Sequence, residues 1–216
     1  MRITCICGCN YDSNIYVVLG KIPTIIDSGT GQHSADVEEG IKKILNPVEI
    51  KQIVLTHEHY DHCGGVKKLH DLTEGKAKII AYKEASKKIE KGESLFAKLL
   101  GGVMPKIPVD VKLSDGDVVK IGDESFEVIY TPGHTPGSMC LYSKESKSLI
   151  SGDTIFPHGS FGRYDLPGGN SAHLKKSIER LSEYDINNLY PGHETIVEGN
   201  ADEHVKLTLK NIKYML

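Results

Sequence analysis

A nearly continuous apolar run, IKQIVLT at residues 50–56, leads directly into the polar cluster HEHYDH at residues 57–62. Strands that read as unbroken apolar runs are typical of sheets covered on both faces. The chain must therefore bury this strand between layers of secondary structure and still present several proton-binding side chains at its end. These side chains are His57, His59, Asp61 and His62.

The rest of the chain predicts two groups of strands separated by helices. Short β-rich runs open the chain, and apolar spacing then predicts helices at 34–45, 64–72, 83–100, 170–183 and from 202 onward. The predicted strands are 2–7, 14–20, 22–29, 50–56, 77–82, 117–121, 125–131, 138–143, 148–153 and 187–193. Two sheets that face each other, with helices on the outside, would satisfy this order.

The length and composition of the chain limit the number of domains and the kinds of partner that we expect. A length of 216 residues suits one well-buried domain, so we predict a single domain over residues 1–216. The formal net charge of -3 provides no basic face for a phosphate backbone, so we expect no nucleic-acid partner. No apolar stretch reaches the length of a membrane span, so we expect no membrane partner either. The oligomeric state is left open.

Five cysteines, three of them in the run CICGC, do not form the pattern of a secreted disulfide framework. We therefore expect a cytoplasmic protein. On a strand, Cys5, Cys7 and Cys9 would share one face, where they would suit a soft metal or redox chemistry. Because no fourth ligand lies nearby, we favour the interpretation that they pack as small residues on a strand.

The histidine cluster has the composition of a metal site. In an extended loop, positions two apart point the same way, so His57 and His59 would converge on one ion. His62 would lie on another side and join Asp61 on a second ion. Imidazole and carboxylate are ligands that suit Zn, Fe or Mn.

Four other predicted strands also lead to a ligand-type side chain. Asp27 ends TIID, His134 ends VIYTPGH, Asp153 ends SLISGD and His193 ends NLYPGH. A single such residue would carry no weight, but their recurrence predicts one metal site assembled from several strand ends.

This series of residues resembles the metallo-β-lactamase superfamily, and the likeness extends to the stretches TPGHTPGS and SGDTIF. The resemblance implies an α/β fold of the αββα type, two facing mixed β-sheets with helices on the outer faces. It implies two divalent metal ions, with Zn²⁺ expected and Fe or Mn as alternatives. The roles that it implies are His57, His59 and His134 on the first ion, Asp61, His62 and His193 on the second, Asp153 as a bridge, and Asp27 as a carboxylate that orients ligands.

Such a pair of cations would lower the pKa of a shared water, and the resulting bridging hydroxide would attack a polarised carbonyl. Asp61 and Asp153 are then the expected catalytic carboxylates, and Asp61 would also orient the nucleophile.

The loop GSFGRYDLPGGN at residues 159–170 resembles short glyoxalase II-like (hydroxyacylglutathione hydrolase-like) proteins and related persulfide dioxygenases. This implies a small-molecule thioester, such as an acyl-glutathione, or a related ester as the substrate. Arg163 would bind a substrate carboxylate or else brace the loop through Asp165 or a carbonyl oxygen, and Tyr164 would line the pocket or else pack. Because little chain follows His193, we expect no C-terminal helical domain that grips glutathione.

Two other activities stay open. A mononuclear-iron persulfide dioxygenase would use mainly His57, His59, His134 and Asp153, whereas a lactonase would make the same attack on a carbonyl as a thioesterase. The presence of all three ligands of the second ion, Asp61, His62 and His193, favours hydrolysis. Cys63 is expected to pack, and the stretch 83–100 is expected to be a packing helix rather than a lid.

Overall fold

The structure, a computed structural model, describes residues 2–215, apart from the side chains of Leu95 and Phe96. The chain forms two compact units. The first runs to Leu113 and includes Lys120–Glu124, and the second consists of Ser114–Val119 and the chain from Ser125 onward.

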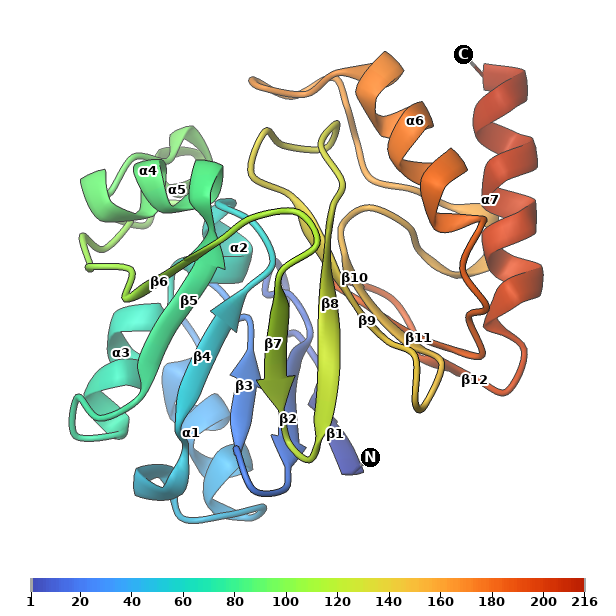
Figure 1. Ribbon diagram of the computed structural model, residues 1–216. Coiled ribbons are helices and arrows are strands. Elements are labelled where there is room, and N and C mark those ends of the chain that lie inside the picture. Colours follow the sequence, from blue (N-terminus) through green and yellow to red (C-terminus); the bar gives the residue numbers. More distant parts are fainter. Residues whose placement is uncertain (1, 216) are drawn as a thin grey trace. The chain divides into compact units, whose positions relative to one another are not determined.

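The first unit is built on a sheet whose strands follow one another in sequence order (Figure 1). Its first three strands pair antiparallel, and the strands from β3 to β6 pair parallel. The strands are β1 (Arg2–Ile6), β2 (Ile15–Leu19), β3 (Thr24–Ile26), β4 (Gln52–Leu55), β5 (Lys78–Tyr82) and β6 (Val111–Leu113). Because β3 and β4 are parallel, their carboxyl ends lie at the same edge of the sheet.

The helices of the first unit cover one face of this sheet. Alternate residues of the strands, among them Ile25, Ile53 and Ile79, pack in one core with Ile41 and Ile89 of the helices. Burial of such side chains is worth about 1.5–3 kcal/mol each. The helices are α1 (Ser34–Lys42), η1 (Pro47–Glu49), α2 (Tyr60–Cys63), α3 (Val66–Leu72), α4 (Lys83–Lys91) and α5 (Leu95–Leu99).

A second sheet has the order β12-β11-β10-β9-β8-β7, and all of it belongs to the second unit except Lys120 and Ile121 of β7 and Glu124 of β8. The strands are β7 (Val118–Ile121), β8 (Glu124–Tyr130), β9 (Met139–Ser143), β10 (Ser148–Gly152), β11 (Asn188–Pro191) and β12 (Val197–Glu198). Strand β9 is antiparallel to β8 and β10, and β10 is parallel to β11, so β8, β10 and β11 all run in the same direction.

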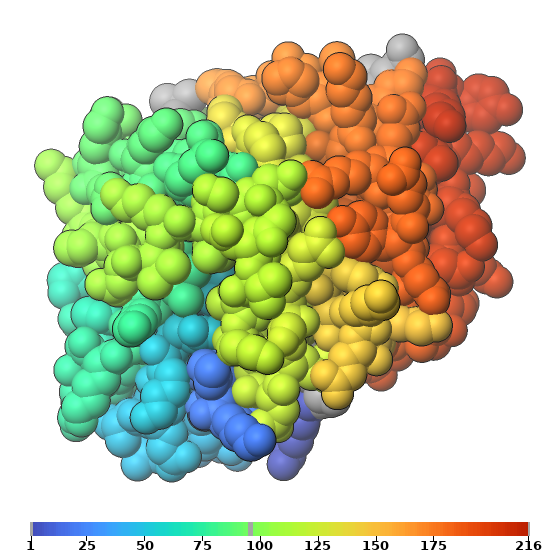
Figure 2. Space-filling model, viewed as in Figure 1, coloured from blue at the N-terminus to red at the C-terminus, as the bar shows by residue number. Residues whose placement is uncertain are grey.

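Helices α6 (Ser171–Leu181) and α7 (Ala201–Met215) contact each other in the second unit, and η2 (Pro157–Gly159) packs on α7. Figure 2 shows α6 in orange and α7 in red at the surface of this unit. Leu174 and Ile178 of α6 and Val205 and Ile212 of α7 share a core with Leu189 of β11. Asn170 caps α6, because its side-chain oxygen accepts a hydrogen bond from the backbone N–H of His173 at 2.9 Å.

The prediction of two mixed sheets with helices is confirmed. The expected helix at 83–100 is two helices, because Gly92 takes the left-handed conformation (φ 66°) and ends α4. Helix α4 buries Ala85 and Ile89 in the core of the first unit, which confirms its packing role. Among residues 2–215, none of the helices combines the length and apolar character of a bilayer-spanning segment.

Candidate metal centre

The first set of predicted ligands lies at the carboxyl ends of β3 and β4. The register pairs Ile26 with Val54, and the backbone N–H of Asp27 donates to the carbonyl oxygen of Val54 at 2.9 Å. Asp27 itself adopts a left-handed backbone conformation with φ of 59°, which aspartate tolerates better than most residues. The turn out of β3 therefore holds a carboxylate next to the end of β4.

Asp27 accepts three hydrogen bonds from the chain that follows β4. Its Oδ1 accepts from the backbone N–H of Thr56 at 2.8 Å, and its Oδ2 accepts from the Thr56 hydroxyl at 2.8 Å. The same Oδ2 lies 2.8 Å from Nδ1 of His62. A carboxylate only accepts, so the His62 proton is on Nδ1 and the imidazole lone pair is on Nε2.

Thr56 sets the tautomer of a second imidazole. Its hydroxyl oxygen lies 3.1 Å from Nδ1 of His57. Because the single hydroxyl proton is donated to Asp27, the oxygen is an acceptor toward His57. His57 therefore also carries its proton on Nδ1 and its lone pair on Nε2. Sequence reasoning missed Thr56, although its position directly before HEHYDH was the available signal.

The backbone of the cluster departs from the expected extended loop. His59 is extended and occupies the N-cap position of α2, and the chain becomes helical at Tyr60, so the extended backbone ends at His59. The structure still gathers the side chains, with one ligand atom each of His57 and His59 within 4.8 Å of each other. Nε2 of His62 lies 3.8 Å from Oδ2 of Asp61.

Helix α2 is fixed to the turn after β3. Ser28 donates twice to the carbonyl oxygen of His62, from its backbone N–H at 2.7 Å and from its hydroxyl at 2.8 Å. At Gly65 an added Cβ would lie 2.2 Å from the carbonyl oxygen of Ser28, so only glycine allows this approach. Cys63 is fully buried, and burial raises its pKa well above the usual range, which confirms the packing role predicted for it.

The second set consists of His134, Asp153 and His193. They follow β8, β10 and β11, whose carboxyl ends lie at one edge because these strands run in the same direction. Nδ1 of His134 donates to the backbone carbonyl oxygen of Arg163 at 2.7 Å, so its lone pair is on Nε2. This use of the Arg163 backbone has no signal in the sequence.

Asp153 stands between the other two residues of this set. Its Oδ2 lies 3.5 Å from Nε2 of His134 and 3.7 Å from Nε2 of His193. These separations are long for charge-assisted hydrogen bonds, which are about 2.7–2.9 Å. Two ligands about 2.0–2.1 Å from one tetrahedral cation are roughly 3.3–3.4 Å apart. The spacing is therefore closer to that of shared metal ligands than to that of an ion pair.

Backbone crowding holds this second set in place. A Cβ at Gly162 would lie 1.9 Å from the carbonyl oxygen of Asp153 and 3.1 Å from Nδ1 of His134. Only glycine lets the loop at 160–163 pass this close to both residues.

The two predicted substrate residues have partners within the second unit. The Arg163 guanidinium makes a two-pronged ion pair with Asp165, at 3.0 Å from Nε and 2.8 Å from Nη2. Its side chain is 65% exposed, and the hydrogen bond to Asp165 raises its pKa. Tyr164 packs against the core of the unit. The structure thus shows the ion pair of Arg163 with Asp165 and the packing of Tyr164, which were the structural alternatives to substrate binding.

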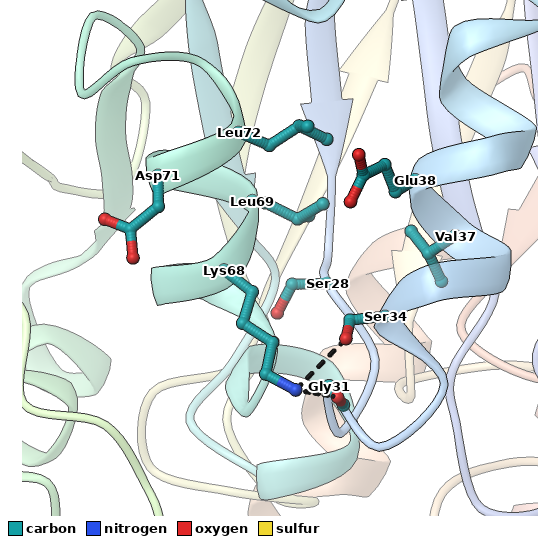
Figure 3. A pocket seen from close by; sticks show the side chains of 10 residues that line it. Ser28, Gly31, Ser34, Val37, Glu38, Lys68, Leu69, Asp71 and Leu72 are labelled. Carbon is teal, nitrogen blue, oxygen red and sulfur yellow. Dashed lines mark hydrogen bonds between the residues drawn. The ribbon is translucent and has the colours of Figure 1, made fainter.

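A cavity of about 300 Å³ between α1 and α3 contains none of the predicted ligands (Figure 3). Lys68 lines it, with Nζ 2.8 Å from the Gly31 carbonyl oxygen and 3.0 Å from the Ser34 hydroxyl. Ser28 and Gly65, which fix α2 to the turn after β3, line the cavity, but none of the predicted ligands does, so we do not assign the chemistry to it.

Comparison with known proteins shows what this arrangement resembles. A family model named the metallo-beta-lactamase superfamily matches residues 10–193. Probable metallo-hydrolases of Methanocaldococcus jannaschii and Bacillus subtilis are 33% and 35% identical over 205 residues, with 93% and 91% of this chain and 96% and 88% of those proteins covered. A hydroxyacylglutathione hydrolase of Maricaulis maris is 35% identical over 70% of this chain, but the match spans only 51% of that protein.

Solved structures match over nearly the whole chain. The BLEG-1 B3 metallo-beta-lactamase superposes with a TM-score of 0.81 and 25% identity, covering 99% of both chains. TTHA1623, crystallised in a di-iron-bound form, superposes with a TM-score of 0.76 and 28% identity, covering 96% of both chains.

Proposed function

This chain belongs to the metallo-β-lactamase superfamily, and from that premise we propose that it is a metal-dependent hydrolase of thioesters or related esters. We assign His57, His59 and His134 to one divalent ion and Asp61, His62 and His193 to a second, with Asp153 shared. Zn²⁺ is the expected metal, and Fe is the principal alternative because a relative of this fold is di-iron-bound.

The observation that carries the proposal is the common tautomer of three imidazoles. His57, His62 and His134 each contact an oxygen acceptor through Nδ1: the Thr56 hydroxyl, the Asp27 carboxylate and the Arg163 carbonyl. Each therefore offers the lone pair of Nε2, the form in which imidazole binds metal. A carboxylate or carbonyl oxygen behind a histidine also raises its basicity as a ligand. The donor set fits divalent metal ions.

When bound, such ions supply a water of lowered pKa and polarise a carbonyl group. We assign the roles of the three carboxylates of the site from the exposure of their side chains. Asp61 is 17% exposed, against 9% for Asp153 and 3% for Asp27. Asp61 is thus the carboxylate best placed to orient the attacking water and to accept its proton, whereas Asp27 holds Nδ1 of His62 and the backbone of Thr56.

The thioester preference rests on likeness to hydroxyacylglutathione hydrolases and on the loop at 159–170. We propose Arg163 as the residue that contacts an anionic group of the substrate, since its exposed guanidinium can exchange Asp165 for a substrate carboxylate of the same geometry. Tyr164 is proposed to line the same region.

The test is turnover of lactoyl-glutathione, a lactone and glutathione persulfide by protein of known metal content. We expect two equivalents of divalent metal per chain and hydrolysis of the thioester, both reduced in His59→Ala and Asp153→Ala variants. Preferred turnover of the lactone would leave a metallo-hydrolase but overturn the thioester assignment. One iron per chain, with oxygen uptake on the persulfide and no hydrolysis, would replace the proposal by a dioxygenase.

A further inference from the structure

Three thiols near the N-terminus are not used by the proposed metal centre. Cys5 lies on β1 and is half-buried, whereas Cys7 and Cys9 are exposed and follow the end of that strand. The predicted packing of all three on a strand is therefore wrong for Cys7 and Cys9. These two side chains are open to a ligand.

The sulfur atoms of Cys5 and Cys7 lie 3.9 Å apart. Both thiols are free, and 3.9 Å is far longer than the roughly 2.05 Å of a disulfide bond. Two thiolates about 2.3 Å from one cation, at trigonal or tetrahedral angles, are about 3.8–4.0 Å apart. The Cys7 thiol donates a weak hydrogen bond to the Cys5 sulfur at this separation, and the same separation suits two ligands of one cation.

We propose that Cys5 and Cys7 form a binding site for a soft, thiophilic cation such as Cu(I), with Cys9 as the third ligand. Sulfur donors select soft cations, whereas the imidazole and carboxylate donors of the proposed hydrolytic centre suit Zn²⁺ or Fe. The two kinds of site would thus take different metals from the same solution.

Residues 7–9 belong to no helix or strand, so the chain can bring Cys9 toward the other two thiols. Two hydrogen bonds hold this segment. The carbonyl oxygen of Cys9 accepts from the backbone N–H of Asp12 at 3.0 Å, and Asn14 Oδ1 accepts from the N–H of Gly8 at 3.5 Å. Movement of Cys9 onto the cation therefore requires these two hydrogen bonds to break, but β1, which ends at Ile6, does not have to change.

Binding of a cation to these thiols should depend on pH, because the cation competes with protons for the sulfur atoms. Burial, and then the neighbouring Cys7, raise the pKa of Cys5 to about 12, so without a cation this thiol keeps its proton at neutral pH. A bound cation must displace the thiol protons. Affinity for Cu(I) should therefore increase with pH across the neutral range.

The experiment is anaerobic competition between the reduced, full-length protein and a chromophoric Cu(I) chelator. We expect one Cu(I) per chain. Cys5→Ser and Cys7→Ser should each weaken binding by more than about a hundredfold, because loss of a ligand exceeds the roughly 10- to 100-fold effect of losing an outer partner. Cys9→Ser should weaken it by about tenfold if Cys9 supplies the third, more mobile ligand.

Two controls separate this site from the rest of the molecule. Cys140→Ala removes a fully buried thiol and should leave Cu(I) affinity unchanged, and His59→Ala should also leave it unchanged while impairing the proposed hydrolytic centre. Unchanged Cu(I) affinity in a folded Cys5→Ser/Cys7→Ser protein would overturn the proposal. So would formation of a Cys5–Cys7 disulfide with oxidised glutathione in a protein that does not bind Cu(I).

Discussion

The Asp27 carboxylate holds Nδ1 of His62 at 2.8 Å, although the two residues are 35 positions apart. The same carboxylate holds the backbone of Thr56. We therefore expect Asp27→Asn to lower metal affinity by about 10- to 100-fold, the usual effect of losing an outer partner of a metal-binding histidine. Metal content after dialysis against a graded chelator measures this.

The matched control is Asp12→Asn. Asp12 is also buried and its Oδ2 also lies 2.8 Å from Nδ1 of a histidine, but that histidine is His33, which is not a predicted ligand. Both variants should lose stability, and only Asp27→Asn should lose metal. Equal metal loss in both would show that Asp27 acts through the fold alone.

Removal of metal should destabilise the protein. A ligand that binds only the folded state, present at 100 to 1,000 times its dissociation constant, stabilises by about 3–4 kcal/mol. We expect the melting temperature to fall when a chelator is added and to recover with Zn²⁺. The response should be smaller in Asp153→Ala. A melting temperature that is insensitive to chelator in the wild type would contradict metal binding by these residues.

Gly162→Ala should disturb the second set of ligands without changing any of them. The new Cβ would lie 1.9 Å from the Asp153 carbonyl oxygen, so the backbone of one of the two residues must move. We expect reduced metal content and lower thermal stability. Gly116→Ala is the control, because its Cβ would meet nothing within 4 Å although its φ of 79° strains alanine. It should lower stability and leave metal content intact.

Arg163→Ala tests the substrate assignment. If Arg163 contacts an anionic substrate, the variant should show KM raised by about tenfold, the order expected for one charge-assisted hydrogen bond, with little change in kcat. Asp165→Ala removes the observed partner and should leave KM equal or lower. A rise in KM of the same size in both variants would assign Arg163 to bracing the loop.

Stability should fall in alkaline solution through Cys140. Burial raises the pKa of this thiol from 9.0 to about 11. Between these values the unfolded chain releases the proton and the folded chain keeps it, so the free energy of unfolding decreases as pH rises, by about 2–3 kcal/mol in all. Urea denaturation at pH 8 and pH 11 should show this decrease in the wild type but a smaller one in Cys140→Ala. An identical decrease in both would contradict it.

The strands and longer helices were predictable because apolar periodicity reports burial directly. Val37 and Ile41, whose spacing predicted α1, are buried in the structure. The short β6 and β12 were missed because three- and two-residue strands leave almost no periodic signal. Helix α2 was missed because its sequence, YDHC, was interpreted as ligands and not as backbone.

The metal-ligand side chains could be predicted from the sequence, because only a few residue types bind metal ions. The groups that orient these side chains could not be predicted from the sequence. The carbonyl oxygen that orients His134 belongs to Arg163, and any residue type at that position would offer the same group. The sequence could not show whether Arg163 pairs with Asp165 or contacts a substrate, because both interactions use the same guanidinium group.

The pairing of Ile26 with Val54 has a consequence for how this chain can vary between species. A residue inserted into the connection at 28–51 would leave the two strand ends as they are. A residue deleted from within β3 would turn Asp27 to the opposite side of the sheet, away from Thr56 and His62. Length changes should accumulate in that connection among descendants of this sequence and be absent from the three residues that precede the carboxylate.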